Sequence, residues 1–236
     1  MQVRPDGHDS LEAVTAEVVT CTACPRLVAW REQVAIEKRA SFAAEEYWGR
    51  PVPGFGDPAA RLLVAGLAPA AHGGNRTGRV FTGDRSGDWL FGALWRAGYA
   101  NQPTSVGADD GLRLTGCYVS AAVRCAPPAN KPTVEERDRC APYLRREIDL
   151  LGDLRVIVVL GQFAYDAVAR LLGVRRRPRF GHLVETAVPA AAGSQWTLLC
   201  SFHPSQQNTY TGKLTEPMLD AVFTRARALA GSAPGG

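Results

Sequence analysis

Two stretches of the chain combine residue types that could do chemistry. Residues 66–87 are rich in glycine and carry Asp84 near their end, and residues 203–214 begin with His203 and continue with hydroxyl and amide side chains. A carboxylate can position or deprotonate a water molecule, and a histidine can donate a hydrogen bond to an oxygen that gains negative charge. Long loops of this composition inside a compact domain favour a functional role over a merely connecting one.

Four cysteines predict a metal site or a redox pair. Cys21 and Cys24 form a Cys-x-x-Cys motif, and Cys125 and Cys140 lie in a second segment much later in the chain. The other two cysteines lie in apolar runs typical of buried strands and are expected to be inert. Structural disulfides are rare in the cytoplasm, which favours metal binding or redox chemistry. The residue types alone leave the metal open, because four-cysteine sites hold zinc as well as iron–sulfur clusters.

Regular elements must position these residues, and apolar patterns alternate along the chain as in a layered α/β fold. Apolar and β-branched runs predict strands at residues 62–67, 116–123, 155–161, 180–188 and 195–202. Amphipathic patterns predict helices at residues 11–19, 27–37, 86–100, 133–151, 162–172 and 216–230, with Thr133 as an N-cap. This order predicts a doubly wound α/β/α sandwich. In such a fold, ligands bind at the carboxyl ends of the strands, where both stretches begin.

The domain organisation is predicted to be simple: residues 1–236 form one domain. Residues 1–58 form an N-terminal segment with the first two cysteines, and the aromatic side chains in residues 41–58 predict irregular structure wrapped over the body. Three prolines within residues 127–132 are expected to exclude a helix there. Residues 232–236 are expected to be a disordered tail.

Charge and hydropathy bear on the partners and the cellular location of the protein. The net charge is +4, and nearly all of the positive charge is arginine. Arginine suits bidentate phosphate contacts, but a bias in coding composition explains the excess of arginine over lysine equally well. The apolar runs are too short to cross a bilayer, and the first residues lack an apolar signal core. We therefore expect a cytoplasmic protein without membrane association.

Three motifs, in this order, carry a resemblance to a known family. The first runs from Gly66-Leu-Ala-Pro-Ala-Ala-His to Thr-Gly-Arg-Val-Phe-Thr-Gly-Asp84; the others are Arg124-Cys-Ala-Pro-Pro-Ala-Asn130 and His203-Pro-Ser-Gln-Gln-Asn208. From about Cys21 to Thr215 the chain resembles the B-type (family 5) uracil-DNA glycosylases. The resemblance implies a three-layer α/β/α sandwich with a central, mainly parallel four-stranded sheet. It also implies a 4Fe-4S cluster, held by the residues that match the family's cysteine pattern, Cys21, Cys24, Cys125 and Cys140.

The resemblance further implies an activity. Such a DNA repair enzyme flips uracil, and other deaminated or damaged bases, out of DNA and hydrolyses the N-glycosidic bond, leaving an abasic site. The implied catalytic residues are Asp84, His203 and Asn130. The implied base-binding residues are Gly66, Leu67, Ala68, Phe81, Asn130 and His203, with Phe81 as the stacking ring. Related glycosylases often carry an acidic or amide residue near positions 67 and 68, where this chain has Leu67 and Ala68. Either Asp84 takes over this role, or the site works mainly by electrostatic stabilisation with a loosely held water.

The expected partner is DNA that contains uracil or other deaminated bases, bound by a monomer. The expected DNA-binding residues are Arg76, Ser205, Gln206, Gln207, Asn208 and Lys213. Further candidate phosphate contacts are Arg79, Arg85, Lys131 and Arg175–Arg177, and together they predict binding that weakens with salt. The residue that fills the gap left by the flipped base stays open among Gln206, Gln207, Asn208 and Tyr210.

Two other classes of protein remain alternatives. In one, the chain is a non-catalytic nucleic-acid binding module stabilised by a metal cluster, and Asp84 and His203 are structural. In the other, the glycine-rich loop binds a nucleotide phosphate. We rank the second last, because the chain has neither a Gly-Lys-Ser/Thr after a glycine loop nor a Gly-x-Gly-x-x-Gly.

Overall fold

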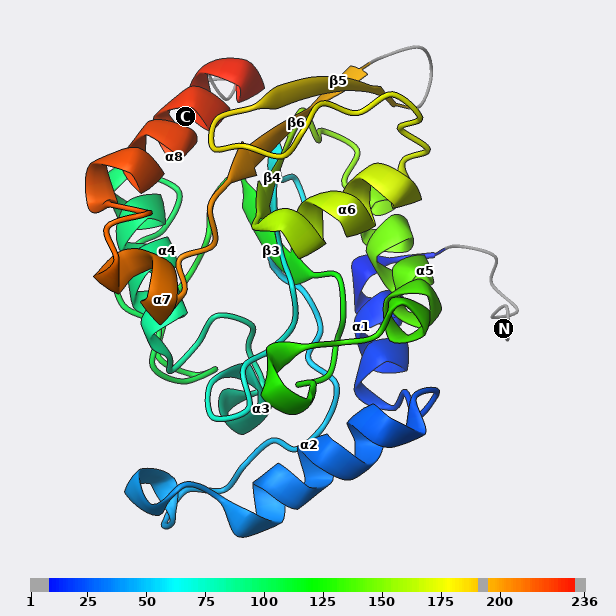
Figure 1. Cartoon of the computed structure of the whole chain (residues 1–236), viewed down its shortest axis with the longest axis vertical. Helices are drawn as coiled ribbons and strands as arrows, with labels where there is room; N and C mark the ends of the chain where they lie inside the picture. The colour runs from blue at the N-terminus through cyan, green and yellow to red at the C-terminus, as the bar shows by residue number, and fades with distance from the viewer. Residues whose placement is uncertain (1–8, 191–194, 232–236) are drawn as a thin grey trace.

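The computed structural model describes residues 9–190 and 195–231, so the expected tail at residues 232–236 lies outside the described part. Its centre is a sheet with the strand order β1-β3-β2-β4-β6-β5 (Figure 1). The strands are β1 (Phe55–Gly56), β2 (Leu62–Gly66), β3 (Cys117–Ala121), β4 (Val156–Leu160), β5 (Glu185–Pro189) and β6 (Gln195–Ser201).

The four central strands, β3, β2, β4 and β6, pair in parallel, as predicted. Val64 in β2 pairs with Val119 on one side and with Val158 on the other. Every residue of β2, β3 and β4 is buried, which is typical of parallel strands covered by helices on both faces. The chain therefore forms the predicted three-layer α/β/α sandwich.

The edges of the sheet differ from the prediction. β1 and β5 add an antiparallel strand at each edge, so the sheet has six strands rather than four. The strand predicted at residues 180–188 begins only at Glu185. The residues before it form a turn, in which Leu183 has a positive φ of 61° and the Val184 N–H donates to the Gly181 carbonyl. β1 lies in residues 41–58, which were predicted to be irregular, and it is only two residues long.

Helices cover both faces of the sheet. The helices α1 (Leu11–Val19), α5 (Val134–Leu150) and α6 (Gln162–Leu171) lie on one face, and α4 (Arg85–Arg96) and α8 (Glu216–Ala230) lie on the other (Figure 1). Alternate residues of β2 serve the two cores: Leu63 packs in the core of α5 and α6, and Val64 packs in the core of α4 and α8. Thr133 caps α5 in a capping box with Glu136, as predicted.

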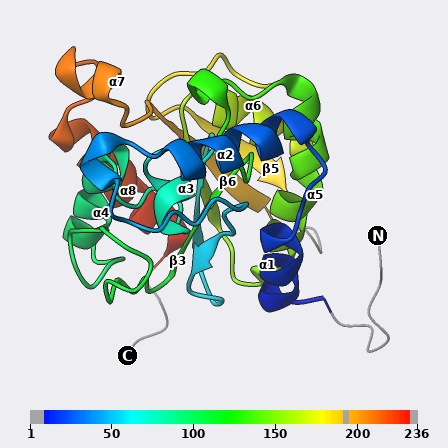
Figure 2. The same cartoon turned by 90° about the horizontal axis from the view of Figure 1, so that it is seen from below.

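Short helices occupy stretches that were predicted to be loops. These are α3 (Gly74–Thr77), α7 (Gln206–Tyr210) and the 3₁₀ turn η2 (Pro128–Asn130), which lies in the proline-rich stretch. Three to five residues are too few to show a helical period in a sequence. The longer helix α2 (Pro25–Glu37) runs past the end of the sheet and contacts α3 (Figures 1 and 2). No helix in the described residues is both long and apolar enough to cross a membrane.

Candidate active site

Asp84 is held by the start of helix α4. The Gly87 backbone N–H donates to Asp84 Oδ1 at 3.0 Å, so the carboxylate is the N-cap of the helix. Its other oxygen, Oδ2, lies against Gly73, where an added Cβ would overlap it and would lie 2.9 Å from Cγ. Burial raises the pKa of Asp84, and the backbone N–H groups of Gly87 and Ser86 oppose this rise. One carboxylate oxygen is thus anchored, and the other faces the backbone of the glycine-rich loop.

Phe81 lies just before this acid in a conformation that few non-glycine residues adopt. Its φ is +55°, and its side chain is buried. The ring lies over Gly66, where a Cβ would come 2.5 Å from Phe81 Cζ, and its carbonyl oxygen occupies the space that a Cβ on Gly87 would need. Non-glycine residues in this backbone region cluster at functional sites, where the surrounding structure compensates the strain.

His203 follows β6 and lies beside Phe81. The two ring centroids are 6.0 Å apart, with planes inclined by 33°. Desolvation lowers the pKa of His203 from 6.5 to about 4, so the imidazole is neutral at pH 7. Gly161 has a φ of +89°, and a Cβ there would lie 3.1 Å from His203 Cβ. The absence of a side chain at Gly161, directly after β4, therefore leaves room for the side chain of His203.

The loop after His203 folds back onto it through α7. Ser205 caps the short helix by accepting a hydrogen bond from the Asn208 N–H, and Asn208 Nδ2 donates to the His203 carbonyl at 2.8 Å. Gln206 and Gln207 are exposed. Tyr210 is 69% exposed, and the Arg85 guanidinium lies 4.8 Å from its ring centroid. Among the four candidates for filling the gap, Asn208 is thus engaged within the protein, whereas the other three side chains face solvent.

Asn130 stands at the exposed tip of the proline-rich loop. Ala129 and Asn130 both have positive φ angles, 53° and 55°, within the 3₁₀ turn. In the described residues, no hydrogen bond joins the Asn130 side chain to Asp84 or His203. The Asn130 side-chain amide is therefore exposed and available to a ligand. It is not hydrogen-bonded to either of the other two expected catalytic residues.

Two arginines of the first loop point inward, although charge alone suggested phosphate contacts. Arg76 donates to the carbonyls of His72 (2.8 Å) and Gly83 (3.0 Å) and forms an ion pair with Glu45. Arg79 is paired with Asp110 at 2.7 Å. Both arginine side chains are buried, and their hydrogen bonds and ion pairs hold the loop in place. Sequence reasoning missed this because the partners of these arginines lie far away in the chain.

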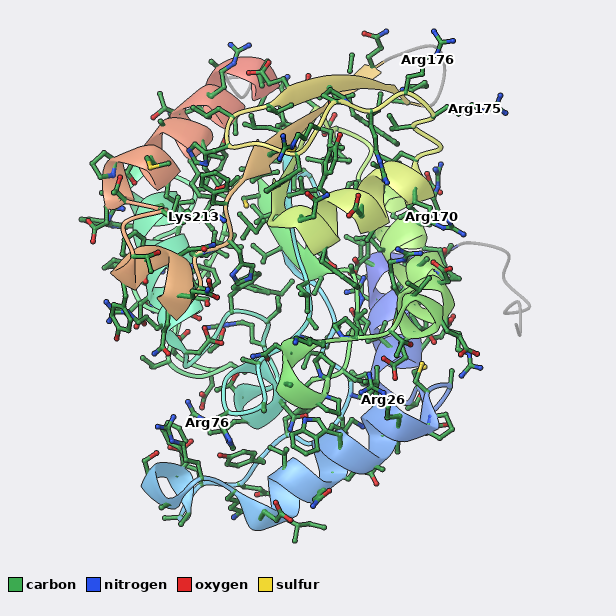
Figure 3. The ribbon with its side chains drawn as sticks, in the orientation of Figure 1. Arg26, Arg76, Arg170, Arg175, Arg176 and Lys213 are labelled. Atoms are coloured by element: carbon green, nitrogen blue, oxygen red, sulfur yellow. The ribbon has the colours of Figure 1, made fainter. Side chains whose placement is uncertain are left out.

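The remaining basic candidates are exposed but scattered. Lys213 lies beside the loop of α7, with its Nζ 5.1 Å from the Phe202 ring centroid, and Arg85 lies next to Tyr210. Arg175 and Arg176 lie at the far end of α6 from α3 (Figure 3). The structure therefore gathers Lys213 and Arg85 near the loop that follows His203, and it leaves Arg175 and Arg176 apart from it.

The four candidate cysteines come together where α2, the proline-rich loop and α5 meet. Cys24, Cys125 and Cys140 are buried in one cluster with Leu27 and Val123. The fourth, Cys21, is partly exposed and is close enough to Cys24 and Cys125 to contribute to raising their pKa values. Burial is the main cause of these shifts, and it raises the pKa of the Cys140 thiol to about 12. In the described residues, no three ligands are spaced to hold a single metal ion.

A buried arginine accompanies the cysteines and was not predicted. Arg31 is 4% exposed, and its Nη1 donates to Cys125 Sγ at 3.1 Å and to the Cys21 carbonyl at 3.2 Å. Its Nε atom is buried without a hydrogen-bond partner in the structure. A run of apolar and charged residues in α2 gives no local signal for such a contact.

Comparison with known proteins identifies the family of the chain. A family model described as the Uracil DNA glycosylase superfamily matches residues 53–227. The chain is 54% identical over 228 residues to a type-5 uracil-DNA glycosylase of Mycobacterium tuberculosis (strain CDC 1551 / Oshkosh), covering 95% of this chain and 84% of the relative. It is 51% identical over 221 residues to a type-5 uracil-DNA glycosylase of Thermus thermophilus, covering 93% and 98%. The resemblance read from the motifs is confirmed, and the chain belongs to the uracil DNA glycosylase superfamily, among its type-5 members.

Proposed function

We propose that this protein is a monofunctional DNA N-glycosylase that removes uracil from DNA and leaves an abasic site. The observation that carries the proposal is that the buried ring of Phe81 lies 6.0 Å from the neutral imidazole of His203 and stands three residues before the capped carboxylate of Asp84. An aromatic face, a neutral hydrogen-bond donor and a fixed acid are what base release needs. The family membership and the names of the relatives support the same reaction.

Base recognition requires that uracil leave the helix, because its glycosidic bond is inaccessible within the stack. In this proposal the flipped base stacks on Phe81, and the floor of its pocket is the backbone at Gly66 and Leu67. The exposed amide of Asn130 offers a donor and an acceptor to the base edge. The positive φ angles of Ala129 and Asn130 place this side chain at the tip of the loop.

His203 would stabilise the departing base. When the bond between C1′ and the base nitrogen breaks, its electron pair leaves with the base, and negative charge grows on the uracil O2 atom. A neutral imidazole N–H can donate a hydrogen bond to that oxygen, and the low pKa of about 4 keeps the group neutral at pH 7. An imidazolium is thus not required for the reaction.

Asp84 would serve the sugar side of the reaction. The sugar becomes an oxocarbenium-like cation, which the carboxylate stabilises, and a water oxygen then bonds to C1′ while the Asp84 carboxylate takes up the proton that this water loses. Because Oδ1 is occupied by the Gly87 N–H, Oδ2 is the oxygen that remains for the water. We also propose that other deaminated or damaged bases such as hypoxanthine are accepted, because Leu67 and Ala68 place no polar side chain in the first motif.

We propose that Cys21, Cys24, Cys125 and Cys140 hold a 4Fe-4S cluster, which ties the N-terminal segment to the proline-rich loop. Three of these thiols are buried in one cluster and Cys21 lies beside them, and four cysteines are the ligand set that such a cluster requires. The buried guanidinium of Arg31, with its unpartnered Nε, fits a site of high negative charge. Electron transfer is not part of the proposed reaction.

Two measurements test the cluster. We expect the purified protein to be coloured and to contain bound iron, and Cys24→Ser to lose colour and stability together. A colourless wild-type protein with stoichiometric zinc would refute the assignment. Cys200→Ser, at a buried cysteine outside the cluster of thiols, is the matched control and should keep its colour.

DNA would be held mainly by exposed groups around the loop after His203. We propose Lys213 and Arg85 as phosphate contacts there, and Lys131 as a further one from the proline-rich loop. Ser205, the N-cap of α7, and Gln206 and Gln207 in its first turn are the proposed polar contacts. With its guanidinium buried, Arg76 would act indirectly, by holding the loop. A monomer acting on chromosomal DNA in the cytoplasm remains a prediction.

The test of function is direct. The protein is incubated with a uracil-containing duplex in the presence of a metal chelator, and alkali-labile abasic sites are then measured. Release of uracil by the wild-type protein and its loss in Asp84→Asn support the glycosylase. DNA affinity without product on any deaminated base would favour the alternative, a non-catalytic nucleic-acid binding module.

A further inference from the structure

One buried side chain connects the cysteine site with the loop that carries the acid. Asn75 lies in α3 and is only 1% exposed. Its Nδ2 donates to the backbone carbonyl of Arg31 in α2 at 3.1 Å, and its Oδ1 is buried without a partner in the structure. A buried amide with one unsatisfied oxygen is costly, so packing alone does not explain an asparagine at this position.

Arg31 makes contacts on two sides. Its guanidinium donates to Cys125 Sγ and to the Cys21 carbonyl, while its own carbonyl accepts the hydrogen bond from Asn75. Because both contacts belong to one residue in the middle of α2, a shift of that helix turn at the cysteines would also move the partner of Asn75. α2 and α3 are in contact, as Figure 2 shows from below.

The path continues from α3 to Asp84 through two short links. Gly73 precedes α3, its carbonyl accepts from the Arg76 and Thr77 N–H groups, and its backbone lies directly against the carboxylate of Asp84. On the other side, Arg76 Nη2 donates to the carbonyl of Gly83, the residue before the acid, at 3.0 Å. Gly73, two residues before Asn75, and Arg76, the residue after it, therefore both help to set where the carboxylate lies.

We propose that Arg31 and Asn75 are positioning residues. Through their hydrogen bonds, a well-ordered four-cysteine site keeps the backbone that contacts Asp84 in a fixed position. This inference rests on the proposed function, in which Asp84 acts on the sugar and its water. In this arrangement the cysteine site does more than stabilise the fold: it fixes the height of the loop on which the acid rests. A displacement of a reacting group by about 1 Å can lower a rate by as much as 10²-fold, so a small loosening of α3 is enough to be measured.

The test compares three variants by activity and by hydrogen exchange. Asn75→Ala should keep its bound metal and its affinity for abasic-site DNA, but should exchange the amide protons of residues 73–77 faster and lower the single-turnover excision rate by roughly tenfold. Arg31→Gln should lose metal to a chelator faster and should also speed exchange at residues 73–77, although its side chain does not touch them. In the double variant, the amide protons of residues 73–77 should exchange no faster than they do in the more affected single variant.

Asn101→Ala is the matched control. This asparagine also donates from its side chain to a backbone carbonyl, that of Gly111, but on an exposed loop away from the cysteines. It should leave metal retention, exchange at residues 73–77 and the excision rate unchanged. If Arg31→Gln does not fold, Arg31→Lys, which keeps the charge beside the thiols, takes its place.

The coupling would be overturned if Arg31→Gln or Arg31→Lys released metal without changing exchange at residues 73–77. It would also be overturned if Asn75→Ala excised uracil at the wild-type rate. Failure of the wild-type protein to release any base would contradict the proposed function instead, and the exchange and metal-retention measurements would still decide the coupling.

Discussion

The carboxylate of Asp84 fills the space that any side chain larger than hydrogen at position 73 would need. The acid and the glycine are neighbours in space because the loop between them turns through α3 before it returns to cap α4. The position of the carboxylate is therefore set from two sides: it accepts a hydrogen bond from the Gly87 N–H, and it packs against the backbone of Gly73.

Gly73→Ala should push the carboxylate off its support. We expect a fall in single-turnover excision of about 10- to 100-fold, because a misplaced group loses the benefit of orientation. Gly152→Ala is the control, since a Cβ there meets nothing within 4 Å. Equal activity of both variants would show that the contact has no functional weight.

Asp84→Asn separates charge from capping. Asparagine is as good an N-cap as aspartate, so α4 should keep its start and the protein its thermal stability. The excision rate should fall by at least roughly 10²-fold, because the fixed negative charge is lost, while binding to abasic-site DNA is retained. An unchanged rate would assign the acid's role to another group.

The pH dependence of stability should carry the signature of His203. Its pKa is lowered from 6.5 to about 4 by desolvation, so the unfolded chain binds a proton in this range that the folded chain does not. The contribution to stability is complete above pH 6.5 and is lost as the pH falls towards 4, by up to roughly 3 kcal/mol. Urea unfolding across this range should show a shallower loss for His203→Gln than for the wild type, and parallel curves would contradict the assignment.

A buried ion pair joins the segment that follows β3, just before Cys125, to helix α5. Arg124 and Glu147 are both 1% exposed on their side chains, and Arg124 Nη1 lies 3.0 Å from Glu147 Oε1. Glu147→Gln leaves a buried guanidinium without its counter-charge and should cost about 3–5 kcal/mol in the free energy of unfolding. Asp149→Asn, which breaks the exposed pair of Asp149 with Arg145, should change it by no more than about 0.5 kcal/mol. Denaturant titration of both variants makes the comparison.

The sequence was informative where the signal is local. The β-branched run at residues 155–161 predicted a strand buried on both faces, and Thr133 with Glu136 predicted a helix start, because burial and capping leave periodic or short-range patterns. The motif around Asp84 pointed to the acid. The support that it receives from Gly73 could not be seen, since a glycine in a loop gives no hint of which side chain lies against it.

Other features depended on contacts between distant residues. Arg76 carries the same charge as an exposed arginine, yet its partner Glu45 comes from the N-terminal segment. The antiparallel strand β5 forms only because Glu185–Pro189 finds an edge of β6 to pair with, and the turn at Leu183 ends the apolar run that suggested a longer strand. Pairing partners of this kind are decided by tertiary structure, not by local composition.

The N-terminal segment has a consequence for where this domain can be cut. The superfamily match begins at residue 53, but Glu45 pairs with Arg76, the Tyr47 hydroxyl lies 3.1 Å from His72 Nδ1, and the Trp48 backbone N–H donates to the Arg76 carbonyl. A fragment that starts at the recognised boundary would lack these partners and half of the cysteine set. We therefore expect a stable fragment to begin before residue 53, because the N-terminal segment supplies ion-pair and hydrogen-bond partners to the glycine-rich loop.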